Sequence, residues 1–371
     1  MSEARIDSLS NESNTGGPTL SGITTFSGTN YFVPPVGRTD QRPQDPQKGE
    51  LRFNTDTYHL EYFRGNTIGW VDIEASNDEL DGGTRGLHMG GIIAPSGRVS
   101  NVDYITISTL GDSIDFGSLV QSASQGAGLG SRTRAIAGGG TPSTPAGTNN
   151  IDYHAFASTG TFADFGDMNT TGFERIALSN STRGVFMGRT VAPNSFNEIE
   201  YITIASTGNA KDFGNLTLNK SGAGAAGNST RAIHCGGSSP HISCDYVTIS
   251  TTGNAADFGD LTSALSNTRG GNCGNAIRGL MAGGNSSGNV IQYVTISTLG
   301  NSVDFGDRTV SKSQIAHMSS TTRACFAGAG EGNDDTIDYV QIMSTGNAVN
   351  FGNLDANNGY GAGASNGHGG L

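Results

Sequence analysis

The sequence predicts an all-β protein whose larger part is a six-bladed β-propeller, preceded by an extended arm and a small β-module. The first observation is a repeat. Six tyrosines are each followed twelve residues later by a phenylalanine, while successive tyrosines lie 49, 48, 45, 47 and 46 residues apart. The second is a composition with 57 glycines and only 15% charged residues, which is typical of tight turns between short, closely packed strands. The third is a small-residue segment near the C-terminal end, after which no full copy of the repeat follows.

Three regions follow from the change in composition along the chain. Residues 1–30 are rich in Ser, Thr, Asn and Gly, and such an arm cannot bury enough apolar surface to fold alone. Residues 31–75 form the small β-module, with polar and apolar residues alternating over 49–54, 58–63 and 70–73. Three strands of this length are marginal in isolation, so the module should pack on a neighbour or on copies of itself. Residues 76–371 form the propeller.

The module carries a resemblance. Its Gly-Glu-Leu-Arg-Phe-Asn-Thr-Asp run at 49–56, Leu-Glu-Tyr-Phe at 60–63, Gly65 and Trp70 resemble a short module near the N-terminus of bacteriophage tail-fibre and virion structural proteins, especially those of cyanophages. The resemblance implies attachment to other virion or tail proteins through residues 1–75, and a homo-oligomer, with a trimer favoured. An unrelated three-stranded sheet is the alternative. The residues expected to make the attachment are Arg52, Phe53, Tyr62 and Trp70.

Each copy of the repeat predicts four strands in 45 to 49 residues. A strand that is preceded by an arginine and usually ends in Gly-Gly is followed by a variable polar loop and a β-branched tyrosine strand. A Gly-Asn type turn leads into a strand with Asp-Phe-Gly, and a small-residue segment leads to the next arginine. Four short strands repeated in this way are typical of a propeller. The repeated residues are Arg85, Arg134, Arg183, Arg231, Arg278 and Arg323; Tyr104, Tyr153, Tyr201, Tyr246, Tyr293 and Tyr339; and Phe116, Phe165, Phe213, Phe258, Phe305 and Phe351.

The C-terminal small-residue segment, 359–364, is expected to complete the first blade and close the circle. Its partners would be the strands that begin near Thr84, Tyr104 and Phe116. Closure would remove an exposed sheet edge. An open solenoid with capped ends is the alternative.

The repeated residues are interpreted as architecture, because a residue present in every copy rarely serves one catalytic site. The Phe and Tyr side chains are expected in the contacts between blades, and the small-residue strands at the narrow centre. The arginine is expected to pair with the aspartate of Asp-Phe-Gly, which would fix the register of the blades. These aspartates are Asp115, Asp164, Asp212, Asp257 and Asp304, and Asn350 stands in the last copy.

Several functions are excluded. A formal charge of −12 without a basic stripe argues against nucleic acid. The sequence contains no run of about twenty apolar residues that could insert in a membrane. The first residues do not resemble a signal peptide, so synthesis in a host cytoplasm is expected. Asp-Phe-Gly lacks the other kinase motifs, and the glycines at 126–130 and 222–227 occur without helical periodicity. The chain is therefore predicted not to be an enzyme and to need no cofactor.

One cluster of His and Cys residues is a candidate metal site. His234, Cys235, His241 and Cys244 lie within eleven residues, and imidazole and thiolate groups suit zinc. On a strand, however, His234 and Cys235 point to opposite faces. No metal site is predicted, and the four cysteines do not indicate a disulfide scaffold.

The order of elements in the repeat broadly resembles kelch-like propellers. Tyr-Val-Thr-Ile, Gly-Asn-Ala, Asp-Phe-Gly-Asp-Leu-Thr and Thr-Arg-Ala are similar to repeat proteins of marine phages. The predicted protein is a phage virion component of the tail that displays a propeller for recognition of a host-surface glycan or protein receptor. Polar loops at 92–101, 140–150, 190–198 and 331–336 would carry the recognition. The alternatives are a polysaccharide-degrading tailspike-type enzyme and a kelch-like protein-interaction module.

Overall fold

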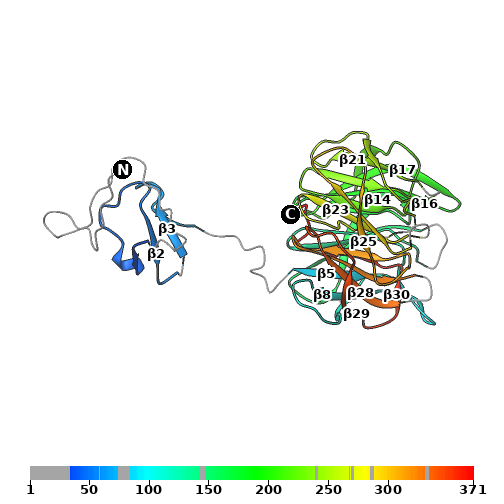
Figure 1. Cartoon of the computed structure of the whole chain (residues 1–371), viewed down its shortest axis with the longest axis horizontal. Coiled ribbons are helices and arrows are strands. Elements are labelled where there is room, and N and C mark those ends of the chain that lie inside the picture. Colours follow the sequence, from blue (N-terminus) through cyan, green and yellow to red (C-terminus); the bar gives the residue numbers. More distant parts are fainter. Residues whose placement is uncertain are drawn as a thin grey trace, which may run out of the picture. The chain divides into compact units, whose positions relative to one another are not determined.

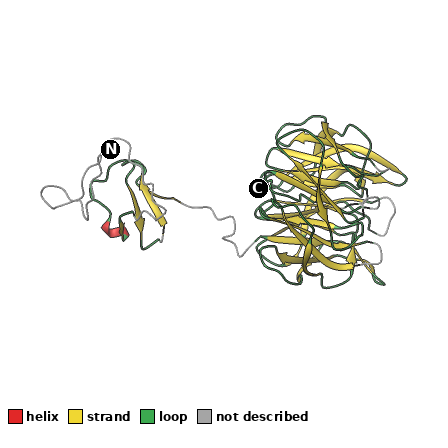
Figure 2. Cartoon of the chain, in the orientation of Figure 1, coloured by secondary structure: helices red, strands yellow, loops and turns green. Residues whose placement is uncertain are grey.

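The computed structural model describes residues 34–57, 59–73, 84–142, 147–238, 241–266, 268, 271–284, 288–330 and 334–371, so the predicted arm, residues 1–30, lies outside the described residues. The chain divides into two compact units, Met1–Asn77 and Asp78–Leu371, called the first and second units below. Strands make up both units (Figure 2), which confirms the all-β prediction. Within the described ranges the one helix is a 3-10 turn, η1 (Thr39–Gln41). None of the described helices could cross a membrane.

The first unit is a four-stranded sheet in the order β1-β2-β3-β4. The three predicted strands are present as β2 (Leu51–Asn54), β3 (His59–Phe63) and β4 (Trp70–Ile73), and they pair antiparallel. The sequence missed β1 (Val36–Gly37), which pairs in parallel with β2. Two residues are too few to show a period of two.

The second unit is a series of antiparallel sheets, one for each copy of the Tyr–Phe unit (Figure 1). They are called repeat sheets 1 to 6 in the order of their tyrosines. Repeat sheet 1 contains β5 (Arg85–Met89), β8 (Asn101–Thr106), β9 (Ile114–Ser118) and β31 (Ala362–Ser365), with β13 (Gly160–Thr161) added at the edge of β9. Repeat sheet 2 contains β10 (Ala127–Gly130), β11 (Arg134–Gly138), β12 (Thr148–Ala155) and β14 (Ala163–Gly172). Repeat sheet 3 contains β15 (Ile176–Ser179), β16 (Arg183–Val191), β17 (Asn194–Thr203) and β18 (Lys211–Asn215).

The remaining repeat sheets follow the same plan. Repeat sheet 4 contains β19 (Gly224–Gly227), β20 (Arg231–Cys235), β21 (Ser243–Thr248) and β22 (Ala256–Asp260). Repeat sheet 5 contains β23 (Arg278–Ala282), β24 (Val290–Thr295) and β25 (Val303–Asp307), with an isolated bridge from Gly274 to Gly279. Repeat sheet 6 contains β26 (Ala316–Ser319), β27 (Arg323–Ala329), β28 (Asp334–Gln341) and β29 (Val349–Asn353). A separate small sheet joins β6 (Ile92–Ile93), β7 (Gly97–Arg98) and β30 (Asn358–Gly359).

Each small-residue strand pairs with the arginine strand that follows it in the chain, as β10 pairs with β11 and β19 with β20. It is therefore the first strand of the next sheet. The C-terminal strand β31 follows the same rule across the ends of the unit, because it pairs antiparallel with β5. The predicted pairing of the C-terminal segment with the first copy is confirmed.

The glycine of Asp-Phe-Gly has a role of its own. In every copy the register shifts at this point between the tyrosine strand and the Phe strand, which is a β-bulge. The glycines have φ between +142° and +159°, and a Cβ on any of them would lie 2.0 to 2.6 Å from the backbone of a glycine in the next copy's hairpin. Only glycine fits both conditions. The motif therefore forms a joint between consecutive repeat sheets.

This joint also links the last copy to the first. Gly111 N in copy 1 donates to Phe351 O in copy 6, as Gly208 N in copy 3 donates to Phe165 O in copy 2. In the same joint, Ser113 N of copy 1 donates to Asn353 O of copy 6. The two ends of the second unit are thus hydrogen-bonded to each other.

The core lies between neighbouring repeat sheets. One buried cluster combines Val185 and Met187 of repeat sheet 3 with Ala225 and Val247 of repeat sheet 4, and Phe213 packs in the same cluster. The repeated Phe side chains are buried, and the Tyr side chains pack against such clusters from the edge. In each copy the two rings meet edge to face, with centroids 5.8 to 6.0 Å apart.

Candidate functional site

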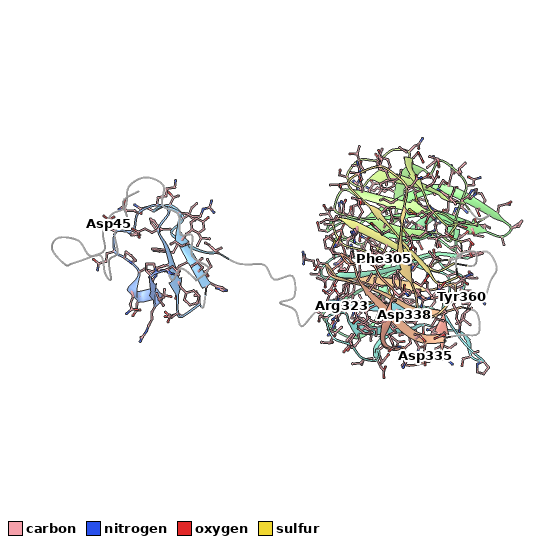
Figure 3. All side chains as sticks on the ribbon, in the orientation of Figure 1. Asp45, Phe305, Arg323, Asp335, Asp338 and Tyr360 are labelled. Atoms are coloured by element: carbon pink, nitrogen blue, oxygen red, sulfur yellow. The ribbon has the colours of Figure 1, made fainter. Side chains whose placement is uncertain are left out.

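The repeated arginine does not bind the aspartate that the sequence assigned to it. Its Nη1 donates instead to a backbone carbonyl of the next copy, at 2.5 to 3.2 Å, and its guanidinium lies 4.3 to 5.1 Å from the centroid of its own copy's tyrosine ring. Arg323 of copy 6, labelled in Figure 3, donates to Ile107 of copy 1. The predicted arginine–aspartate pair is wrong, because the five aspartates are exposed on the Phe strand. The arginine is a clamp between repeat sheets.

Replacing Arg183 by methionine is therefore expected to lower the free energy of unfolding by about 1 to 2 kcal/mol, since a hydrogen bond and a cation–π contact are lost while the alkyl chain remains. Arg183 donates to Ile249 O at 2.8 Å and lies 4.3 Å from the Tyr201 ring centroid. Asp212→Asn, the matched control, should stay within about 0.5 kcal/mol of the parent because Asp212 is exposed. Urea denaturation of both variants measures this. If both variants lose the same free energy of unfolding, the predicted pair between arginine and aspartate would be supported instead.

A second polar position in the repeat was missed by the sequence analysis. The residue before each repeated tyrosine is a buried acid or amide that points toward the segment after the Phe strand of the preceding copy. Asp245 accepts from Thr217 N and Oγ1 at 3.0 and 2.8 Å, and Gln292 accepts from Thr262 Oγ1 at 2.7 Å. Alignment of the six copies could have found the position. Its members are Asp103, Asp152, Glu200, Asp245, Gln292 and Asp338.

At the junction of the last copy with the first, this contact joins two acids. Asp103 is buried, and Asp355 of copy 6 takes the place that Thr217 and Thr262 have elsewhere. Burial, and then the hydrogen bond with Asp355, raise the pKa of Asp103 to about 8. Asp103 is therefore protonated near neutral pH.

This proton makes stability depend on pH. An unfolded Asp carboxyl titrates near pH 3.9, so between about pH 4 and 8 the folded state holds a proton that the unfolded state releases, and stability falls as pH rises. Asp355→Asn is expected to reduce the fall in melting temperature between pH 5 and pH 8.5, because it removes the like charge. Asp257→Asn, at an exposed position, is the control. Identical pH profiles for parent and Asp355→Asn would contradict the effect of Asp355 on the pKa of Asp103.

The third polar feature surrounds the starts of the small-residue strands. Backbone bonds run from copy to copy here: Gln125 N donates to Tyr360 O, Glu174 N to Gln125 O, and Gly222 N to Glu174 O. Further bonds join Thr268 N to Gly222 O and Tyr360 N to Gln314 O. We call this set the inner arc; it consists of Gln125, Glu174, Gly222, Thr268, Gln314 and Tyr360.

The inner arc contains every non-glycine residue with positive φ in the described part of the chain. Gln125, Glu174, Gln314 and Tyr360 have φ of 60° to 65°, and each lies nine residues after the repeated Phe. Gly222 occupies the same position in its copy with φ of 60°. A side chain in this conformation costs about 1 kcal/mol or more, and such strain concentrates at functional sites. Four polar or aromatic side chains are thus kept where glycine would be more stable.

Polar atoms are dense around the inner arc. Glu174 Oε2 accepts from Thr190 Oγ1 at 2.8 Å and from Ser221 Oγ at 3.3 Å, and the hydroxyls of Ser195 and Ser238 lie 2.8 Å apart beside them. Three buried atoms here have no hydrogen-bond partner among the described residues, at an average cost of about 1 to 3 kcal/mol each. They are Gln314 Oε1, Thr268 Oγ1 and Asn358 Oδ1.

Three of the four predicted recognition loops contact this arc or its neighbours through their described residues. Arg98 Nε, from 92–101, donates to Ser124 Oγ beside Gln125, and Thr141 Oγ1, from 140–150, donates to Gln125 Oε1 at 3.1 Å. Thr190 belongs to 190–198 and bonds Glu174. The loop at 331–336 follows Gly330, which packs on Gln314 and Tyr360; residues 331–333 and 143–146 lie outside the described residues.

In the first unit, the predicted attachment residues divide between two hollows. Arg52 and Trp70 line one of about 350 Å³, together with Val36 and Leu51, whose side chains are exposed. Tyr62 lines another of about 310 Å³ with Phe63. Phe53 is partly buried in β2 and lines neither.

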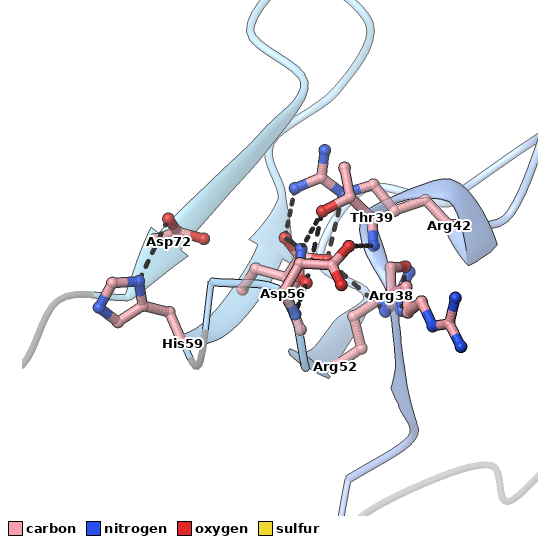
Figure 4. Close-up of polar contacts among 9 residues, drawn as sticks. Arg38, Thr39, Arg42, Arg52, Asp56, His59 and Asp72 are labelled. Carbon is pink, nitrogen blue, oxygen red and sulfur yellow. Dashed lines mark hydrogen bonds and ion pairs between the residues drawn. The ribbon is translucent and has the colours of Figure 1, made fainter.

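Arg52, which lines the first of these hollows, belongs to a group of polar contacts (Figure 4) that includes the buried carboxylate of Glu61. Glu61 accepts from Arg42 Nε at 3.2 Å and from Asn54 Nδ2 at 3.1 Å, and Arg52 Nε lies 3.6 Å from its Oε1. Arg52 also donates to Arg38 O at 2.9 Å. These bonds hold the guanidinium of Arg52 in place, 5.9 Å from the Trp70 ring centroid.

The candidate metal cluster of His234, Cys235, His241 and Cys244 is divided between two strands and their connection. Cys235 lies opposite Cys244 on the neighbouring strand, and His234 lies opposite Asp245. Within the described ranges, no group of three or more His, Cys, Asp or Glu side chains could hold a metal ion.

No protein-family model matches the chain. A search of curated proteins finds no match either.

Proposed function

We propose that the repeat sheets close into a six-bladed β-propeller, with the small-residue strands around its axis and β31 completing the first blade. Four kinds of contact between copies 6 and 1 support this. They are the bond from Gly111 to Phe351, the clamp from Arg323 to Ile107, the acid pair of Asp103 and Asp355, and the pairing of β31 with β5. Each repeats, or replaces, a contact that also joins copies within the chain.

On this scaffold, we propose that the second unit binds a host-surface glycan at the inner arc and does not act as an enzyme. The observation that carries the proposal is the set of four strained side chains, Gln125, Glu174, Gln314 and Tyr360, at equivalent positions. Amide, carboxylate and hydroxyl groups match the hydroxyls of sugars, and a tyrosine ring offers an apolar face for a sugar ring. The unpartnered oxygens nearby would accept bonds from sugar hydroxyls.

In this proposal the chain is a structural component of a phage tail. Residues 1–75 would attach it to other virion proteins, as a homo-oligomer with a trimer favoured, and the hollow between Arg52 and Trp70 would receive the partner. The support is the resemblance of the module together with the exposure of Val36, Leu51, Ile68 and Ile73 around a sheet whose buried side chains are mostly polar. Trp70→Ala should then abolish incorporation into particles without changing binding to host cells.

The glycan proposal is tested on the full chain with Tyr360→Gly. Gly222 shows that glycine suits this backbone position, so the variant should melt at or above the parent temperature while it loses binding. Binding is measured on host cells and on an array of envelope glycans. Ile114→Ala, at an exposed position on an outer strand, is the control and should bind like the parent.

Unchanged binding by Tyr360→Gly would move recognition away from the inner arc. If the parent protein binds none of the glycans and no host cells, the proposed adhesion is wrong, and only the structural role in the tail remains as a proposal. Release of sugar fragments from host polysaccharide would favour the tailspike-type enzyme instead.

A further inference from the structure

Two of the four cysteines face each other across neighbouring strands. Cys235 ends β20, Cys244 lies near the start of β21, and the two are direct partners in the antiparallel ladder. Both are buried in the same apolar cluster, with Phe258 and Leu261. After burial, the neighbouring Cys235 thiol raises the pKa of Cys244 further. The two sulfur atoms are therefore close neighbours.

The position of the pair in the ladder suits a covalent link. Gly236 N donates to Ser243 O and Ile249 N donates to Thr230 O, so hydrogen-bonded pairs alternate from these points. Cys235 and Cys244 then form a non-hydrogen-bonded pair, in which Cα atoms lie about 4.5 Å apart. Disulfides span Cα distances of about 4.4 to 6.8 Å. The backbone already has a separation that a disulfide can bridge.

The other copies show that packing alone does not call for cysteine here. The equivalent cross-strand partners are all apolar or glycine: Met89 with Val102, Gly138 with Ile151, Met187 with Ile199, Ala282 with Ile291, and Ala327 with Ile337. Copy 4 departs from this rule at both members of the pair together. The remaining cysteines, Cys273 and Cys325, lie in two other clusters.

We propose that Cys235 and Cys244 are a modification site that forms a cross-strand disulfide with a low-molecular-weight disulfide as oxidant. One cysteine thiolate attacks a sulfur of the oxidant and releases one small thiolate. The second cysteine thiolate then attacks the mixed disulfide and releases the other. The two thiol protons end on the two released thiolates, so two protein thiols are oxidised and one small disulfide is reduced.

Burial determines how the reaction proceeds. It raises the pKa of Cys244 well above its usual value, and both side chains are enclosed, so oxidation of the folded protein requires local opening of β20 from β21. Oxidation during folding meets no such barrier.

The test uses the full chain with oxidised glutathione in two arms, one on the folded protein and one during refolding from denaturant. Free thiols are then counted under denaturing conditions, and the link is mapped by peptide mass spectrometry. The expected result is a fall from four thiols to two, with Cys235 joined to Cys244, in the refolding arm and more slowly in the folded arm.

Two variants borrow residues from other copies, so they should fold. Cys235→Ala follows Ala282, and Cys244→Val follows Val102. Each should abolish the intramolecular link, whereas Cys273→Ala should leave it intact and reduce the count from three thiols to one. Four free thiols after both arms, or a link that maps to Cys273 and Cys325, would overturn the proposal.

Discussion

Replacing Gly363 by alanine is expected to destabilise the second unit by about 3 kcal/mol. A Cβ on Gly363 would lie 2.1 Å from His317 O and 2.7 Å from His317 N. On the other side, a Cβ on Gly128 would lie 2.3 Å from Gly363 O. The obstructing atoms are backbone, so no side-chain rotation relieves the clash.

Gly126→Ala is the matched control for this prediction. It also adds one methyl group close to a small-residue strand, but its nearest neighbours would be backbone oxygens at 3.5 Å, an ordinary contact. Thermal and urea denaturation followed by circular dichroism should separate the two variants clearly. If Gly363→Ala is as stable as Gly126→Ala, then β31 does not lie between β10 and β26, and the closed propeller fails with it.

The small-residue strands are an example of a part of the fold that could be predicted from the sequence. Their composition predicts close packing, and the pairing of β31 with β5 follows from an unfinished copy at the end of the chain. The tyrosine and Phe strands follow from alternation and from the constant interval between Tyr and Phe. These predictions succeed because strand pairing and burial depend on residue patterns within short segments of the sequence.

The partner of the arginine could not be predicted in the same way. The sequence offers an aspartate in each copy, but the guanidinium binds a backbone carbonyl, and every residue has one. The residue type of the partner therefore gives no information about this contact. By contrast, the buried acid or amide before each tyrosine was visible and needed only an alignment of the copies.

The inner arc could not be predicted from the sequence for a different reason. A turn with positive φ is usually recognised by glycine or asparagine, and among the described residues at this position Gly222 alone gives that signal; Asn267 gives it in the sequence. Gln125, Glu174, Gln314 and Tyr360 have the same backbone conformation without the expected residue type. Strained positions are those where local rules fail, so their recognition requires coordinates. The loops around them were predicted because they differ between copies.

The second large effect is expected at the buried ion pair of Arg308 and Asp338. Arg308 Nη2 lies 3.1 Å from Asp338 Oδ2, and both side chains are almost completely buried. Asp338 also accepts from Thr309 Oγ1, as Gln292 accepts from Thr262 in the preceding junction. Removing either charge leaves the other buried and unpaired. Arg308→Leu and Asp338→Gln should each cost about 3 to 5 kcal/mol.

The double variant should recover most of that loss. Leu261 and Gln292 are the residues that the junction between copies 4 and 5 has in place of Arg308 and Asp338, so Arg308→Leu with Asp338→Gln transfers a native pair. Its stability should lie within about 1 kcal/mol of the parent, because a buried ion pair and a packed apolar substitute are often equivalent. Urea denaturation of the four proteins gives the coupling energy. If the losses in free energy of unfolding of the two single variants add up in the double variant, the junctions between copies 4 and 5 and between copies 5 and 6 are built differently. Strong coupling would show that the residues of one junction can replace those of the other.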